Sequence, residues 1–291
     1  MAAPAPSPSA PAFSRAAAPE TPFLLESDGF PVYAVLHSAA PGRPDAPVVV
    51  HVHGLGVEQI TLYRQEVLVA RAAAARGLPA LRWHARGHGD SAGSSADVRF
   101  ATLVADARAA ADEARARTGA RRVIWLGVRL GALVAAHAAA GRDDTAGFVL
   151  WEPVARPADF FRLQLRTLLF SQVAGGRKPD ATVDQLLARL EHDGELDVLG
   201  YTLHRDTVAS FGDAALAPAL VAAAAPVRIA QVQGRAKLAP AHAQLVEALG
   251  ASADVRTELL SEEPGYQLMT NPAWQCDALT RITVEWLDAL A

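Results

Sequence analysis

The stretch VIWLGVRLGALVA, residues 123–135, decides the fold. Its first four residues are apolar and have the composition of a buried strand. They lead through Gly127-Val128-Arg129-Leu130-Gly131 into an apolar, alanine-rich segment that predicts a helix over 130–140. The two glycines permit a tight turn and a close approach of the backbone. The stretch therefore predicts a strand–turn–helix unit with Arg129 at the apex of the turn.

Strands and helices alternate on both sides of this unit. An Asp28-Gly29 pair between two apolar runs predicts a β-hairpin near the start of the chain. The following pattern predicts an α/β protein with a mostly parallel, doubly wound sheet. The expected strands are 48–53, 78–83, 123–126, 147–151, 227–232 and 255–260, and the expected helices are 59–76, 99–117, 130–140, 240–249 and 272–290.

Two segments fall outside this alternation. Residues 1–20 consist mainly of Ala, Pro and Ser, which offer little to bury, and are expected to form a disordered tail. Residues 155–225 contain helical segments and a possible hairpin but no parallel-strand pattern. We expect them to form an insertion in a core built from 21–154 and 226–291. The alternative is that they form an ordinary helical layer of that core.

Composition excludes several classes of protein. The 27 basic and 31 acidic residues give a net charge of −4 and are well mixed, so no basic surface for nucleic acid or an anionic membrane is expected. The apolar run 219–225 is far shorter than the ~20 residues of a membrane span. Cys276 is the sole cysteine, which excludes an intramolecular disulfide. No metal-ligand spacing and no cofactor motif is evident, and we expect a cytoplasmic protein.

Two further glycine-rich loops follow predicted strands. His53-Gly54-Leu55-Gly56 ends the strand at 48–53, and Arg86-Gly87-His88-Gly89-Asp90-Ser91 follows Trp83. Together with the turn at Arg129, their order and spacing resemble the α/β-hydrolase superfamily from Phe23 onward. In that superfamily the turn is the nucleophile elbow, Gly-x-Ser-x-Gly, and the first loop supplies an oxyanion donor. The resemblance implies an α/β-hydrolase fold in which 155–225 is a helical cap.

A narrower resemblance rests on three segments. The elbow with Gly-x-Arg-x-Gly, the run 148–154 (FVLWEPV) and the segment 199–203 (LGYTL) are similar to the exosortase-associated hydrolase 2 group and its serine-aminopeptidase-like relatives. Those proteins also carry arginine at the elbow.

The catalytic triad of a serine hydrolase is not recognisable. Arg129 stands at the nucleophile position, Lys237 at the acid position, and Tyr266 near the histidine position. The last histidine, His242, belongs to the preceding predicted helix. Because a serine triad needs all three groups in mutual hydrogen-bond contact, this mechanism is not expected here.

A cation at the start of a helix is unfavourable unless it is compensated. Glu152, at the end of the neighbouring strand, is the stronger candidate partner for Arg129, and Glu58 is the second. One interpretation is a structural ion pair that fills a dead active site. The other is a site for an anionic ligand, since a guanidinium binds carboxylate or phosphate in bidentate geometry. The candidate binding residues are Arg129, Leu130, Leu55, Gly54, Glu152, Glu58 and His88.

Two functions remain open at this point. The first is a hydrolase-family protein that acts on or binds a small, anionic, acyl or ester-like substrate without a serine nucleophile. The second is a catalytically dead relative that serves as a binding or scaffold protein in a biosynthetic or export pathway. A protein partner or a homodimer fits the second. A nucleic-acid or membrane partner fits neither.

Overall fold

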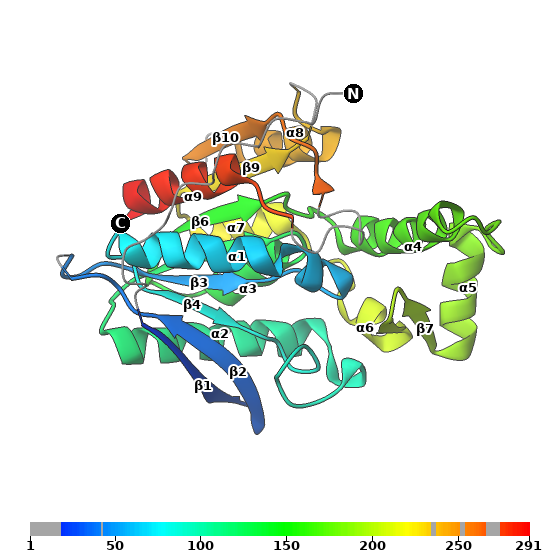
Figure 1. Ribbon diagram of the computed structural model, residues 1–291, viewed down its shortest axis with the longest axis horizontal. Helices are drawn as coiled ribbons and strands as arrows, with labels where there is room; N and C mark the ends of the chain where they lie inside the picture. The colour runs from blue at the N-terminus through cyan, green and yellow to red at the C-terminus, as the bar shows by residue number, and fades with distance from the viewer. Residues whose placement is uncertain (1–18, 42, 234–236, 251–253, 266–273) are drawn as a thin grey trace, which may run out of the picture.

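The computed structural model describes residues 19–41, 43–233, 237–250, 254–265 and 274–291, and its centre is one eight-stranded sheet (Figure 1). The strand order is β1-β2-β4-β3-β5-β6-β9-β10. Strand β2 is antiparallel to β1 and β4, and all other pairs are parallel. The predicted doubly wound sheet is confirmed. Its strands are β1 (Glu20–Ser27), β2 (Phe30–His37), β3 (Val48–Val52), β4 (Ala80–Trp83), β5 (Val123–Val128), β6 (Thr145–Trp151), β9 (Val227–Val232) and β10 (Val255–Leu260).

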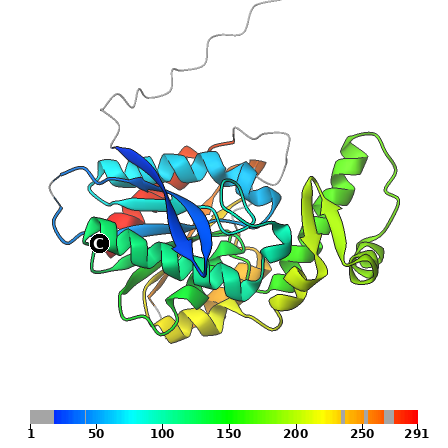
Figure 2. The same ribbon diagram turned by 90° about the horizontal axis from the view of Figure 1, so that it is seen from below.

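Helices cover both faces of the sheet (Figures 1 and 2). Because side chains alternate along a strand, Trp125 of β5 packs into the core on one face, whereas Ile124 and Leu126 pack on the other. The first face is covered by α2 (Phe100–Thr118), α3 (Gly131–Ala139), α7 (Leu216–Ala223) and α8 (Pro240–Leu249), and the second by α1 (Val57–Ala75) and α9 (Asp277–Leu290).

The first hairpin forms where the sequence predicts it. Asp28 and Gly29 have φ values of 49° and 80°, which is the geometry of a two-residue turn with both central residues left-handed. The segment expected to form a disordered tail, 1–20, overlaps the first strand at its end, because Glu20 pairs with His37 in the sheet. Residues 1–18 lie outside the described residues.

An insertion of helices and a small hairpin separates β6 from β9. It contains α4 (Pro157–Ala174), α5 (Val183–Asp193), β7 (Glu195–Val198), β8 (Tyr201–His204) and α6 (Arg205–Ser210), followed by α7. The helices α4 and α5 and the hairpin project to one side of the sheet (Figures 1 and 2). Helix α7 instead packs against α3 in the core layer. A short 3-10 helix, Ser95–Asp97, contacts β8.

The described part of the chain contains neither a helix that could cross a membrane nor a cluster of metal ligands. None of the helices has the length and apolar character that crossing a membrane requires. Within the same residues, no group of three or more His, Cys, Asp or Glu side chains is arranged to hold a metal ion.

A buried polar cluster lies between α1 and the strands β2, β3 and β4. Arg82 Nε donates a hydrogen bond to His37 Nε2 at 2.9 Å, and both ring nitrogens of buried His51 lack a partner among the described residues. Glu66 of α1 is 4% exposed, and one of its carboxyl oxygens also lacks a described partner. Burial raises the pKa of Glu66 to about 8, against the opposing charge of Arg82. The folded protein therefore holds Glu66 in its protonated form at neutral pH.

Ionising Glu66 should destabilise the fold. Its folded pKa of about 8 exceeds the unfolded value of about 4.3, so its contribution to stability is complete below pH 4.3 and is lost as the pH rises through 8. Between pH 5 and pH 9 the free energy of unfolding of the wild type should fall by a few kcal/mol relative to Glu66→Gln. Chemical denaturation across this pH range measures the difference. The exposed helical control Glu247→Gln should follow the wild type. Parallel pH profiles for Glu66→Gln and the wild type would contradict the assignment.

Candidate functional site

The turn at Arg129 has the geometry of a strained strand-to-helix elbow. Arg129 has a φ of 54°, in the left-handed region that non-glycine residues rarely adopt. A Cβ atom on Gly131 would overlap the carbonyl oxygens of Val52 and His53, so β3 and the start of α3 can approach only with glycine there. A Cβ on Gly127 would likewise collide with Ala132. The elbow is therefore intact although it carries no nucleophile.

The arginine at the apex is buried and paired within the protein. Arg129 is 7% exposed, and its Nε donates to Glu58 Oε1 at 3.2 Å. Its Nη1 donates to the backbone carbonyl oxygen of Glu152 at 2.9 Å. Glu58 is also 7% exposed. The counter-charge of the elbow arginine thus comes from the first turn of α1.

A residue of the insertion completes this contact. Gln164 of α4 donates its side-chain amide to Glu58 Oε1 at 3.1 Å, so that one oxygen accepts from both Gln164 and Arg129. Burial raises the pKa of Glu58, while the charge of Arg129 and both hydrogen bonds oppose that shift. Because a guanidinium is always protonated, the carboxylate serves as its counter-ion. The pair links the elbow, α1 and the insertion.

Glu152, which the sequence favoured as the partner, has a different role. Its side-chain Oε1 accepts a hydrogen bond from the backbone N–H of Val232 in β9. Its backbone carbonyl oxygen accepts the hydrogen bond from Arg129 Nη1. The ion pair that the structure shows for Arg129 is thus with Glu58, the second of the two candidates. Position in sequence shows which strand end a residue occupies but not which way its side chain turns.

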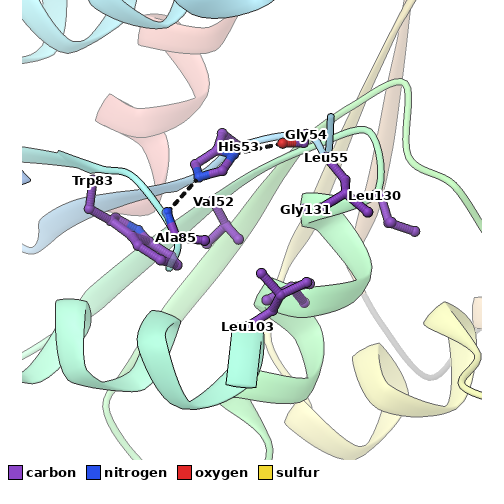
Figure 3. Close-up of a pocket in the computed structure, with 10 residues that line it drawn as sticks. Val52, His53, Gly54, Leu55, Trp83, Ala85, Leu103, Leu130 and Gly131 are labelled. Atoms are coloured by element: carbon purple, nitrogen blue, oxygen red, sulfur yellow. Dashed lines mark hydrogen bonds between the residues drawn. The ribbon is translucent and has the colours of Figure 1, made fainter. Parts of the chain in front are cut away.

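The loop after β3 faces the start of α3 across a small cavity (Figure 3). Gly54 and Leu55 line it from one side, and Leu130 and Gly131 line it from the other. The cavity has a volume of about 10 Å³, which is room for about one water. The backbone groups expected to stabilise an oxyanion therefore border this small cavity.

His53 fixes this loop. Its Nδ1 lies 2.6 Å from the carbonyl oxygen of Gly54, and its Nε2 accepts from the N–H of Ala85 at 3.1 Å (Figure 3). Burial lowers the pKa of His53 to about 3, so the ring is neutral. Both ring nitrogens are engaged, which leaves His53 unable to act as a base.

The loop after β4 is also held by internal contacts. Arg86 forms an ion pair with fully buried Asp106, with Nη2 and Oδ1 2.6 Å apart. The hydroxyl of Ser91 donates to the carbonyl oxygen of His84 and accepts from the N–H of Tyr33. Ser91 is thus a structural residue. His88 is 5% exposed, and burial lowers its pKa to about 4.

Among the described residues, His242, Cys276 and Lys237 offer no evident replacement for the base. The side chain of His242 is buried, with Nδ1 2.6 Å from Gln231 Oε1 and Nε2 3.1 Å from the carbonyl oxygen of Pro153. Cys276 is buried at the start of α9, and burial raises the pKa of its thiol to about 12. Lys237 is exposed. The rest of the predicted acid loop, 234–236, and Tyr266 lie outside the described residues.

Two residues at the site were not predicted from the sequence. Gln164 reaches Glu58 from α4, and Tyr201 of β8 packs its ring over Gly56. Both belong to the insertion, and their contacts span more than 100 positions of sequence. The only available signal was the family-like segment 199–203, which contains Tyr201.

Comparison with known families agrees with this geometry. The sequence model of the family described as serine aminopeptidase, S33, matches residues 43–196, which is 154 of 291 residues. The chain belongs to the serine aminopeptidase S33 family. No curated protein matches the chain, and the narrower resemblance to the exosortase-associated group stays a prediction.

Solved structures of hydrolases share the fold of this S33-family protein. Est1E from Butyrivibrio proteoclasticus is 18% identical with a TM-score of 0.63, over 92% of this chain and 98% of its own. An esterase from Pyrococcus furiosus is 12% identical with a TM-score of 0.63, over 94% and 91%. Proline iminopeptidase from Mycobacterium smegmatis is 14% identical with a TM-score of 0.58, over 93% and 98%. At these identities the likeness establishes the α/β-hydrolase fold.

Removing the counter-charge of Arg129 should destabilise the S33-family fold. Glu58→Gln leaves a buried cation without its carboxylate and should lower the free energy of unfolding by about 3–5 kcal/mol. The matched change Glu152→Gln should cost less, because a glutamine oxygen can still accept from Val232. Urea denaturation of both variants measures the contrast. A larger loss of unfolding free energy in Glu152→Gln than in Glu58→Gln would show that Glu152, and not Glu58, supplies the counter-charge of Arg129.

Proposed function

We propose that this member of the S33 family is a binding protein that has lost serine hydrolase chemistry. The observation that carries the proposal is the contact between Arg129 and Glu58. A buried guanidinium at the elbow cannot attack a carbonyl, and it is already neutralised by an internal carboxylate. The ligand site lies between the elbow and the insertion, which acts as the cap.

The surrounding residues support this reading. His53, before the oxyanion loop, and His242 of α8 both have their ring nitrogens against protein atoms. The hydroxyl of Ser91 is engaged by the backbone. These described groups therefore do not form the pair of nucleophile and base that a serine hydrolase needs. Since family membership does not establish chemistry, the site rather than the fold decides the function.

The alternative is an enzyme, and it would require the ion pair between Arg129 and Glu58 to open. A small acyl or ester-like, anionic substrate would have to separate Glu58 from Arg129 and take its place. The N–H groups of Leu55 and Leu130 would then stabilise the oxyanion. The closed ion pair favours the binding protein over this alternative. A role as a scaffold in a biosynthetic or export pathway fits the same proposal. With one buried thiol, we also propose a cytoplasmic location.

Neither the wild type nor Arg129→Ser should behave as a serine hydrolase. The wild type lacks a nucleophile, and a lone serine at 129 would lack an activating base. Incubation with a fluorophosphonate probe followed by intact-protein mass measurement should show no adduct. Turnover of a p-nitrophenyl ester by Arg129→Ser should not exceed that of the control Arg129→Ala. Stoichiometric labelling of one serine in the wild type would overturn the proposal and point to Ser91. Ester hydrolysis by Arg129→Ser alone would reveal an unseen base.

A further inference from the structure

The insertion between β6 and β9 exposes large apolar side chains on the second half of α4. The first half of this helix is anchored in the core, where Phe160, Phe161 and Leu165 are buried. The second half carries Phe170 and Val173, which are 57% and 53% exposed and lie one turn apart. Figures 1 and 2 show that this part of the chain projects to one side of the sheet. Apolar side chains that gather on a surface are typical of a contact with another molecule.

Cations without a counter-ion lie beside these apolar side chains. The segment 156–189 has three aspartates and no glutamate, and each aspartate pairs with an arginine. The pairs are Arg156–Asp159, Arg162–Asp184 and Arg189–Asp180, at 3.0, 2.6 and 3.5 Å. Its other three cations are exposed and have no acidic partner among the described residues. They are Arg166, Arg177 and Lys178, which together with Phe170 and Val173 we call the basic end.

Carboxylates gather in another part of the same insertion. Four exposed acidic residues alternate through the end of α5 and β7, and we call them the acidic edge: Glu191, Asp193, Glu195 and Asp197. Within the described residues none of the four pairs with a lysine or arginine side chain. Asp193 lies 4.0 Å from His192, and Glu195 lies 3.6 Å from His204. Arg205 pairs with Asp206 and donates to the backbone carbonyl oxygen of Glu191.

The basic end and the acidic edge are complementary in charge but do not pair within one chain. No ion pair joins them among the described residues. A second copy of the chain offers both complements at once, because a two-fold axis brings the same surface of each copy to the other. An anionic membrane would match the basic end and repel the acidic edge. Three cations are also fewer than the 4–8 basic residues that are typical of a lipid-binding cluster.

We propose that the insertion is the contact surface of a symmetric homodimer. The basic end of one copy meets the acidic edge of its partner, and the two-fold axis repeats this contact. Phe170 and Val173 lie beside the cations and are covered in the same contact. The proposal concerns a surface outside the elbow and goes beyond the loss of serine hydrolase chemistry.

Sedimentation velocity of the full chain tests for this association. The wild type should pass from monomer to dimer between micromolar and millimolar concentrations, and added salt should favour the monomer because it screens exposed charges. Phe170→Ser keeps every charge and should weaken the dimer by removing apolar contact. The control Glu247→Lys changes an exposed charge on α8 and should leave the association unchanged.

Two charge-reversed variants test the pairing of the two surfaces. One carries Arg166→Glu, Arg177→Glu and Lys178→Glu, and the other carries Glu191→Lys, Asp193→Lys and Glu195→Lys. All six side chains are exposed, so both variants should fold. Asp197 is kept because its Oδ1 accepts from the N–H of Gly200 in the hairpin turn.

Each reversed variant alone should have a dissociation constant at least about tenfold larger than the wild type, because like charges then face each other. An equimolar mixture of the two variants should recover the dimer. In the mixed pair, the reversed end of one variant meets the reversed edge of the other, and the two unchanged surfaces also meet.

Three results would overturn the proposal. They are a wild type that stays monomeric at millimolar concentration, reversed variants that dimerise as the wild type does, and a mixture that stays monomeric. If the wild type is monomeric, cosedimentation with phosphatidylglycerol vesicles that is lost on reversing the basic end would assign that end to a membrane instead.

Discussion

The buried contact between Arg129 and Glu58 is the interaction on which the rest of the site depends. The side chain of Arg129, at the apex of a left-handed turn, is buried, and a buried charge without a partner is costly. It also sits where the start of α3 presents the positive end of a helix dipole, which disfavours a cation. A carboxylate within hydrogen-bond distance offsets both penalties. The turn that carries the nucleophile in serine hydrolases therefore carries one member of a buried ion pair in this protein.

The position of Glu58 gives this pair wider consequences. As an acidic residue in the first turn of α1, it is favourably placed against that helix's own dipole. It is also the point at which Gln164 connects α4 to the core. One carboxylate therefore links the elbow, the helix after β3 and the insertion. Its second oxygen, Oε2, has no hydrogen-bond partner among the described residues.

Much of the fold could be predicted from local sequence. Asp28-Gly29 encodes a hairpin because few residue pairs tolerate two left-handed conformations in succession. Gly127 and Gly131 identify the elbow because only glycine permits the approach of β3 to α3. The apolar runs of the parallel strands gave their positions to within a few residues. These features depend on residues that are close in sequence, so they can be predicted without a structure.

The site was less predictable because its contacts are long-range. The sequence indicated that Arg129 needs a carboxylate and named two candidates, but the choice of Glu58 over the carboxylate of Glu152 depends on side-chain direction. Gln164 and Tyr201 lie in an insertion whose packing against the core has no local signature. His53 and Glu66 are neutral because they are buried. The hydrophobic pattern of a sequence does not show whether a single polar residue is buried.

The central claim is that Arg129 and Glu58 neutralise each other, and a double-mutant cycle tests it most directly. The free energies of unfolding of Arg129→Met, Glu58→Gln and the double variant would be measured by urea denaturation at neutral pH. When both members of a buried ion pair are replaced in the double variant, no uncompensated charge remains. The account therefore predicts that the double variant is destabilised by much less than the sum of the single changes, with a coupling energy of at least about 2 kcal/mol. Additivity to within about 0.5 kcal/mol would show that the two residues do not depend on each other, and would contradict the account.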